Sequence, residues 1–139
     1  MIIKKHVFLV DKDKNQLNYF MSALDDVTES CKCTYAKDHS KAVEMLKYVH
    51  PDFIIIENNL PDMTGLQLLS IIKNKSKLKE TRAFIYSDQI SEELTKMAKI
   101  LGAAGCIEKN GTVSWLTHQL KAIMAGELLP AYVLLKNSE

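Results

Sequence analysis

The chain has 139 residues, of which 47% are hydrophobic and 25% are charged, and its formal net charge is +1. This is the length of one ordinary domain, and the composition excludes an intrinsically disordered chain. The near-balance of 18 basic and 17 acidic residues gives no reason to expect nucleic acid or an anionic membrane as a partner.

Short apolar runs alternate along the chain with segments in which apolar residues recur every three or four positions. The runs are typical of strands and the periodic segments are typical of helices. The run at 31–36 alternates, which favours an edge strand, whereas 53–56 is apolar on both faces, as in a central parallel strand. In chain order we expect strand 7–10, helix 15–24, strand 31–36, helix 39–49, strand 53–56, helix 66–72, strand 83–86, helix 91–101, strand 104–107 and helix 112–125.

Five strands that alternate with five helices predict an α/β sandwich with a parallel sheet. We expect one domain over 1–126, followed by an apolar tail over 127–139 that packs on the domain or on a dimer partner. Trp115 lies off the apolar stripe of the last helix and is a candidate interface anchor. The alternative is that Trp115 packs against the tail.

The apolar runs are too short to span a bilayer, and Asp11 interrupts the first one before a signal-peptide core could form. The cysteines are odd in number, at 31, 33 and 106, which is unlike the disulfide scaffold of a small secreted domain. We therefore expect a cytoplasmic protein with free thiols. Cys31 and Cys33 share one face of their strand and are interpreted as small buried hydrophobes.

Polar and charged side chains follow four of the five predicted strands. Ligands bind at this edge of open parallel sheets, outside the carboxyl ends of the strands. The group comprises carboxylates, a hydroxyl and ammonium groups, which we expect to converge. Its members are Asp11, Lys12, Asp13, Glu57, Ser87, Asp88, Glu108 and Lys109.

Four segments of the chain resemble receiver domains of two-component response regulators, the CheY-like, flavodoxin-like phospho-acceptor modules. The segments are VFLVDKD, PDFIIIENNLPDMTGLQLL, FIYSD and LGAAGCIEKN, and they stand in the family's order. The resemblance implies a doubly wound sandwich with strand order 2-1-3-4-5. It also implies phosphorelay signal transduction through protein–protein interaction and not an enzyme.

The resemblance implies a role for five positions. Asp11 matches the first of two acids that help to hold Mg²⁺, and Lys12 stands where the second usually is. Glu57 occupies the position of the aspartate that accepts phosphate from a histidine kinase. Ser87 matches the switch hydroxyl, and Lys109 matches the lysine that contacts the phosphoryl group.

Two of these positions depart from the family pattern where the chemistry is most demanding. Mg²⁺ requires oxygen ligands in near-octahedral geometry, and the ammonium of Lys12 cannot supply one. Glu57 is longer than aspartate by one methylene, which disfavours an in-line phosphoryl transfer that depends on positioning. We therefore expect no phosphorylation and no resident cofactor, with Mg²⁺ at Asp11 only if metal is bound at all. Lys12 or Lys109 is expected to pair with Glu57.

Two interpretations of Glu57 stay open: it mimics the phosphorylated, active state, or it marks a decayed site. Two further departures disfavour switching. Cys106 stands where the family often has an aromatic residue, and Asn110 stands where proline is common, so we expect a trans bond before Asn110.

The length leads us to expect a stand-alone receiver that binds a histidine kinase or a downstream signalling protein, through the last helix and the edge around Lys109. One alternative is a phosphorylation-competent receiver in which Glu57 or Asp13 accepts phosphate. The other is a small flavodoxin-like enzyme or nucleotide binder, against which no Gly-rich phosphate loop follows the first strand.

Overall fold

A parallel sheet of five strands lies at the centre of the computed structural model, which describes residues 5–27, 30–109 and 111–126. The strand order is β2-β1-β3-β4-β5, and each neighbouring pair is parallel. The strands are β1 Lys5–Val10, β2 Cys31–Ala36, β3 Phe53–Glu57, β4 Arg82–Ser87 and β5 Gly105–Glu108. The predicted fold class and strand order are confirmed.

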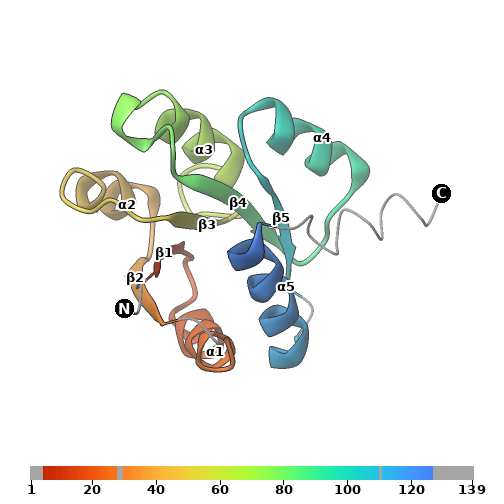
Figure 1. The fold of residues 1–139 in the computed structure, drawn as a ribbon. Helices are drawn as coiled ribbons and strands as arrows, with labels where there is room; N and C mark the ends of the chain where they lie inside the picture. The colour runs from red at the N-terminus through yellow and green to blue at the C-terminus, as the bar shows by residue number, and fades with distance from the viewer. Residues whose placement is uncertain (1–4, 28–29, 110, 127–139) are drawn as a thin grey trace.

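Helices cover both faces of the sheet (Figure 1). In the described ranges they are α1 Lys14–Asp25, α2 His39–Met45, α3 Gly65–Lys73, the 3₁₀ helix η1 Ser76–Leu78, α4 Glu92–Ile100 and α5 Val113–Ala125. Helices α1 and α5 pack on one face, and α2, α3 and α4 pack on the other (Figure 1). No helix in the described part of the chain combines the length and the apolar character needed to cross a membrane.

Alternate side chains of the central strand enter two separate cores. Ile54 and Ile56 contribute to the core under α2, α3 and α4, whereas Phe53 and Ile55 contribute to the core under α1 and α5. Because both faces are covered, the central strand is apolar throughout its first four residues. The fifth residue, Glu57, is the first polar side chain, and it lies where the strand reaches the edge of the sheet.

The helix that was expected over 39–49 ends at Met45. Asp38 caps it, with a side chain that accepts a hydrogen bond from the backbone N–H of Lys41. The apolar spacing misplaced the end because Val49 still packs against the core after the chain has left the helix. Ser91 caps α4, since its hydroxyl accepts from the backbone N–H of Leu94 at 3.0 Å.

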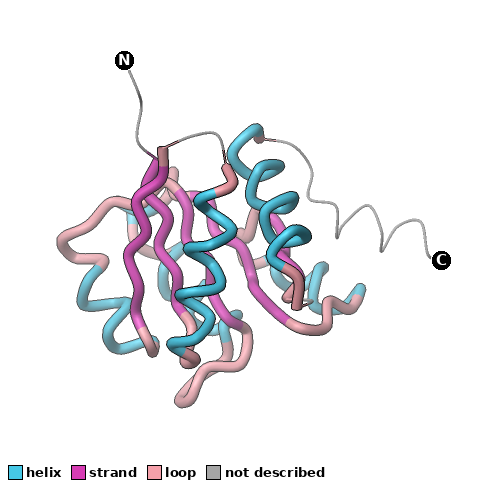
Figure 2. Tube along the Cα trace, turned by 90° about the horizontal axis from the view of Figure 1, so that it is seen from below, coloured by secondary structure: helices cyan, strands magenta, loops and turns pink. Residues whose placement is uncertain are grey.

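The loops that leave the strands gather at one edge of the sheet. Figure 2 shows the strands side by side, with loops beyond both of their ends. Because all five strands are parallel, the residues after β1, β3, β4 and β5 meet at the carboxyl edge.

Candidate functional site

The carboxylate of Asp11 is fixed by the backbone around it. Asp11 follows β1, is fully buried, and donates its backbone N–H to the carbonyl of Ala36. Its Oδ1 accepts from the backbone N–H of Asp13 at 2.9 Å, and the hydroxyl of Tyr35 donates to its carbonyl at 2.6 Å. Asp13 in turn caps α1 by accepting from the backbone N–H of Asn15. The other carboxylate oxygen of Asp11, Oδ2, is directed toward Lys109.

Glu57 reaches the same edge from β3 and is only 7% exposed. The start of α3 approaches it closely, because the N–H of Gly65 donates to the carbonyl of Asn58 at 2.8 Å. A Cβ at position 65 would lie 2.5 Å from the carbonyl oxygen of Glu57, so this approach requires glycine. The Gly65 of the sequence motif therefore sets the backbone around Glu57.

Lys109 joins the two carboxylates. Its Nζ lies 2.7 Å from Oδ2 of Asp11 and 2.8 Å from Oε2 of Glu57. Within the described ranges these two oxygens have no other partner. The ammonium also lies 4.7 Å from the ring centroid of Tyr86, within the range of a cation–π interaction. We call this arrangement the Asp11–Lys109–Glu57 triad.

The electrostatics of the triad follow from one cation that lies between two anions. Burial raises the pKa of Glu57, and the hydrogen bond from Lys109 does not fully offset it because Asp11 adds a repulsive charge. Burial lowers the pKa of Lys109, but its hydrogen bonds to Asp11 and Glu57 outweigh that effect and leave the pKa raised. The triad therefore favours the charged form of Lys109, whereas the environment of Glu57 disfavours its ionised form.

Lys12 does not take part in the triad. Its side chain is exposed, and it forms no ion pair with any residue that the structure describes. Of the two lysines expected as partners of Glu57, only Lys109 pairs with it. Lys12 instead lines a cleft of about 450 Å³ at the carboxyl edge. The other residues that line this cleft are Asp11, Asp13, Gln16, Glu57, Asn59, Ser87, Asp88, Gln89 and Lys109.

Ser87 lies at the end of β4, on the rim of the same cleft. Its hydroxyl donates to the carbonyl of Gln89 at 3.1 Å and so bonds within its own loop. Cys106 lies on β5, is fully buried, and packs in the core under α2, α3 and α4. The position where related sequences often have an aromatic residue is thus filled by a small core side chain.

The donor set of the cleft does not fit Mg²⁺. The two inward carboxylate oxygens are bridged by the Lys109 ammonium, and the next position in the sequence supplies the ammonium of Lys12. The carboxylate of Asp13 caps α1. Among the described residues no group of three or more His, Cys, Asp or Glu side chains could hold a metal ion. A divalent cation needs several oxygen ligands in near-octahedral geometry, which these residues do not offer together.

Trp115 is half-buried at the start of α5 and is not fully exposed. Its indole N–H donates to Oε1 of Glu108 at 3.0 Å, and its ring stacks on that of His118 at a centroid distance of 5.6 Å. The fully buried Gln119 accepts from the N–H of Glu108 and donates to its carbonyl. The residue just before Lys109 is therefore fixed to α5 by two side chains.

Sequence reasoning missed the role of Gln119. The available signal was a polar residue among the apolar positions of α5, next to Leu120. Cys31 and Cys33 pack against the core under α1 and α5, and burial raises the pKa of Cys33 to about 11. The expectations for Asn110 and for the tail over 127–139 lie outside the described residues.

Comparisons with known proteins agree on one family. The family model for the response regulator receiver domain matches residues 7–121. The structure is similar to the phosphorylated cyanobacterial phytochrome response regulator RcpA, with 25% identity, a TM-score of 0.78 and coverage of 92% of this chain and 99% of that one. It is also similar to the chemotaxis response regulator CheY4 of Vibrio cholerae, with 24% identity, a TM-score of 0.75 and coverage of 88% and 98%. The Mn²⁺-bound form of the response regulator Rcp1 has 20% identity, a TM-score of 0.75 and coverage of 91% and 99%.

Proposed function

We propose that this chain, which belongs to the response regulator receiver domain family, is a receiver that keeps a constant charge in its cleft and signals by binding a protein partner without being phosphorylated. The observation that carries the proposal is the Asp11–Lys109–Glu57 triad, in which one buried ammonium contacts both carboxylates at 2.7 and 2.8 Å.

Two features of the cleft oppose phosphoryl transfer, one in the triad and one at Lys12. The Glu57 oxygen that faces Lys109 is already in a charge-assisted contact, so attack on phosphorus would require that contact to loosen. Phosphoryl transfer also depends on cations that neutralise charge on the transferred group, and Lys12 replaces a metal ligand with an ammonium.

The partner surface in this proposal is the carboxyl edge of the sheet together with the start of α5. The cleft brings carboxylates and ammonium groups to one opening, and the half-buried Trp115 bonds to Glu108, the residue just before Lys109 of the cleft. Tryptophan with part of its ring exposed is a common anchor in protein interfaces. A histidine kinase or a downstream signalling protein is the class of partner that the family implies.

Incubation with acetyl phosphate and Mg²⁺, followed by intact-mass measurement, tests the absence of phosphorylation. The native chain is expected to keep its mass. A double variant, Lys12→Asp with Glu57→Asp, restores the family pattern and is expected to gain one phosphoryl group. Addition of a phosphoryl group to Glu57 or Asp13 of the native chain overturns the proposal.

The role of Glu57 in partner binding is a separate question with its own test. Glu57→Gln keeps the shape of the side chain and removes its charge. If Glu57 stands in for the phosphorylated state, the variant loses affinity for its kinase or downstream partner. Unchanged affinity identifies a decayed site in which Lys109 neutralises a carboxylate without a signalling role.

A further inference from the structure

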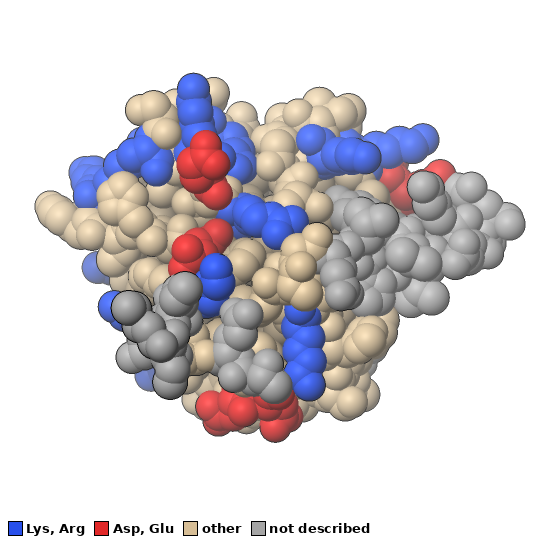
Figure 3. Space-filling view, viewed as in Figure 1, with Lys and Arg blue, Asp and Glu red and all other residues tan. Residues whose placement is uncertain are grey.

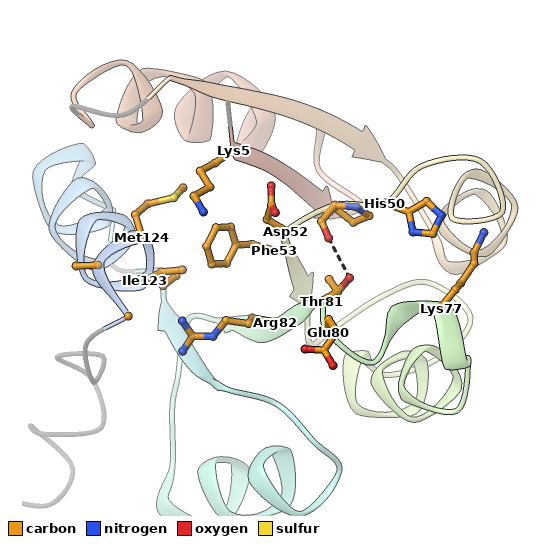
Figure 4. A pocket seen from close by; sticks show the side chains of 13 residues that line it. Lys5, His50, Asp52, Phe53, Lys77, Glu80, Thr81, Arg82, Ile123 and Met124 are labelled. Carbon is orange, nitrogen blue, oxygen red and sulfur yellow. Dashed lines mark hydrogen bonds between the residues drawn. The ribbon is translucent and has the colours of Figure 1, made fainter. Parts of the chain in front are cut away.

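A second cleft, of about 440 Å³, lies at the opposite edge of the sheet, where the strands begin. Figure 4 shows His50 and Lys77 at one end of this cleft and Lys5 and Arg82 toward the other. The proposed signalling function does not use this edge, which is rich in basic side chains.

The two acids that line the second cleft are already engaged. The Oδ2 of Asp52 accepts from the backbone N–H of His6 at 2.8 Å. Burial lowers the pKa of Lys73, and the negative charge of Glu80 opposes that shift, so Glu80 acts on a lysine of its own segment. By contrast, the lysines and the arginine of the rim form no ion pair with any residue of the described ranges.

The segment that contributes one wall of this cleft is rich in lysine. Residues 73–80 read KNKSKLKE, with four lysines and one glutamate, which is a net charge of +3. The whole chain has a net charge of +1, so the remaining residues together are net negative. Leu78 is fully buried and fixes η1 to the core, whereas Lys77 and Lys79 on either side of it are exposed. Figure 3 shows basic side chains gathered at the upper left, in the region where Figure 1 places α2 and α3.

The chain between α2 and β3 lies against this lysine-rich segment, because the Nζ of Lys77 donates to the carbonyl of Lys47 at 2.7 Å. Leu46 is buried and Val49 packs against the core, so the two residues between them face outward. Lys47 is exposed. Tyr48 is 81% exposed, more than any other large hydrophobic residue in the described part of the chain. An aromatic ring therefore stands beside a group of exposed ammonium groups.

We call the surface formed by Lys47, Tyr48, His50, Lys77 and Lys79 the amino-edge patch. We propose that the amino-edge patch binds an acidic segment of a partner protein. Its ammonium groups complement glutamate and aspartate side chains, and the ring of Tyr48 offers a contact for an apolar residue of that segment. A short acidic segment fits better than nucleic acid, because the rest of the chain is net negative and repels a long polyanion. The patch lies at the edge opposite the triad, so its occupation requires no change at Glu57.

A titration of the ¹⁵N-labelled full chain, followed by NMR, tests this binding. The probe is the peptide EELEEL, and the control is QQLQQL, in which every carboxylate side chain is replaced by an amide. We expect EELEEL to move the backbone N–H signals of residues 46–50 and 75–80, and QQLQQL to leave them in place. Signals that do not move, that move equally with QQLQQL, or that move more at other lysines than at the patch overturn the proposal. A thymidine oligonucleotide of the same charge that binds the patch more tightly than EELEEL identifies nucleic acid as the ligand and also overturns it.

Two matched double charge reversals sharpen the test. Lys47→Glu with Lys79→Glu changes the patch, whereas Lys14→Glu with Lys96→Glu changes two exposed lysines that do not line the second cleft. Affinity for EELEEL is expected to fall about four- to twentyfold in the patch variant, as for the loss of two exposed ion pairs. The control variant should fall less than twofold. Both variants change the net charge equally, so an equal loss of affinity would show long-range attraction alone and contradict a binding site at the patch.

Discussion

The two sides of the carboxyl-edge cleft differ in how firmly their side chains are engaged. On one side Asp11, Glu57 and Lys109 are all more than 85% buried as side chains and are joined by contacts shorter than 3 Å. On the other side the hydroxyl of Ser87 is half-exposed and bonds only to a loop carbonyl, that of Gln89. The two sides meet through the backbone, because the carbonyl of Ser87 accepts from the backbone N–H of Lys109 at 2.9 Å, but the Ser87 hydroxyl bonds within its own loop and not to the triad.

The difference bears on which side of the cleft could carry a signal. A switch needs an element that changes partners between two states. The triad already supplies charge neutralisation, and Cys106, buried in the core on β5, has no aromatic ring that could move. In the proposed receiver the charged side therefore keeps one arrangement, and removal of its members one at a time tests this.

The largest effect is expected when the shared cation is removed. Lys109→Met leaves two buried carboxylates facing each other without a counter-charge. The free energy of unfolding at neutral pH is expected to fall by about 3 kcal/mol, as for other broken buried ion pairs. Urea denaturation measures it, with Lys12→Met as the matched control. Because Lys12 is exposed and unpaired among the described residues, its variant should unfold like the native chain.

The pH dependence of stability gives a second test of the contribution of the Lys109 ammonium. The folded-state pKa of Lys109 is raised above its ordinary value of 10.5, so its contribution is fully present below pH 10.5 and is lost as the pH rises through the folded pKa. The stability difference between the native chain and Lys109→Met should therefore narrow in this alkaline window. A difference that stays constant up to the most alkaline pH measured contradicts the triad.

A smaller effect, of opposite sign, is expected at Glu57. Its folded-state pKa is raised, so the stability linked to it is fully present below pH 4.5 and is lost as the pH rises through the folded value. Glu57→Gln has no carboxyl group to ionise, so the variant does not lose this stability as the pH rises. At neutral pH the variant should be as stable as the native chain or more stable by up to about 1 kcal/mol, as when buried charges are replaced by neutral groups. Urea denaturation of the native chain and of Glu57→Gln, at neutral pH and at about pH 5, measures the difference in their free energy of unfolding at each pH.

Strong destabilisation of Glu57→Gln at neutral pH would contradict this prediction, because the carboxylate would then stabilise the fold. The expected result would instead show that the two carboxylates of the triad differ in what they contribute to stability. Asp11 also holds the backbone N–H of Asp13, whereas no backbone contact of the Glu57 side chain is seen among the described residues. A charge that does not stabilise the fold is better explained by what it presents to a partner.

Much of this arrangement could be predicted from residue patterns. The apolar run before Glu57 and the Gly65 that follows it are local features with strong physical causes: burial on both faces of a strand and a close backbone approach. The convergence of Asp11, Glu57, Ser87 and Lys109 on one edge follows from parallel strands alone. The parallel α/β architecture was therefore predictable from the alternation of strands and helices, whereas the strand order followed only from the resemblance to receiver domains.

The choice between Lys12 and Lys109 could not be read in the same way. Both lysines follow a strand at the same edge, and only the three-dimensional direction of each side chain decides which one reaches Glu57. The hydrogen bond of Trp115 could not be read from the sequence for a similar reason. Its helix position places it off the apolar stripe, but its indole N–H reaches Glu108, and such a polar contact leaves no periodic signal in the sequence.

The smallest effect is expected on the hydroxyl side. Ser87→Ala removes a single hydrogen bond, from a half-exposed hydroxyl to the carbonyl of Gln89, which water can replace. The free energy of unfolding should change by no more than about 0.5 kcal/mol, the range of surface substitutions. Partner affinity should also be unchanged, because a hydroxyl that is bonded within its own loop transmits nothing from the triad. Loss of partner binding in Ser87→Ala, with stability intact, would contradict a fixed receiver, since it would give the hydroxyl side a signalling role of its own.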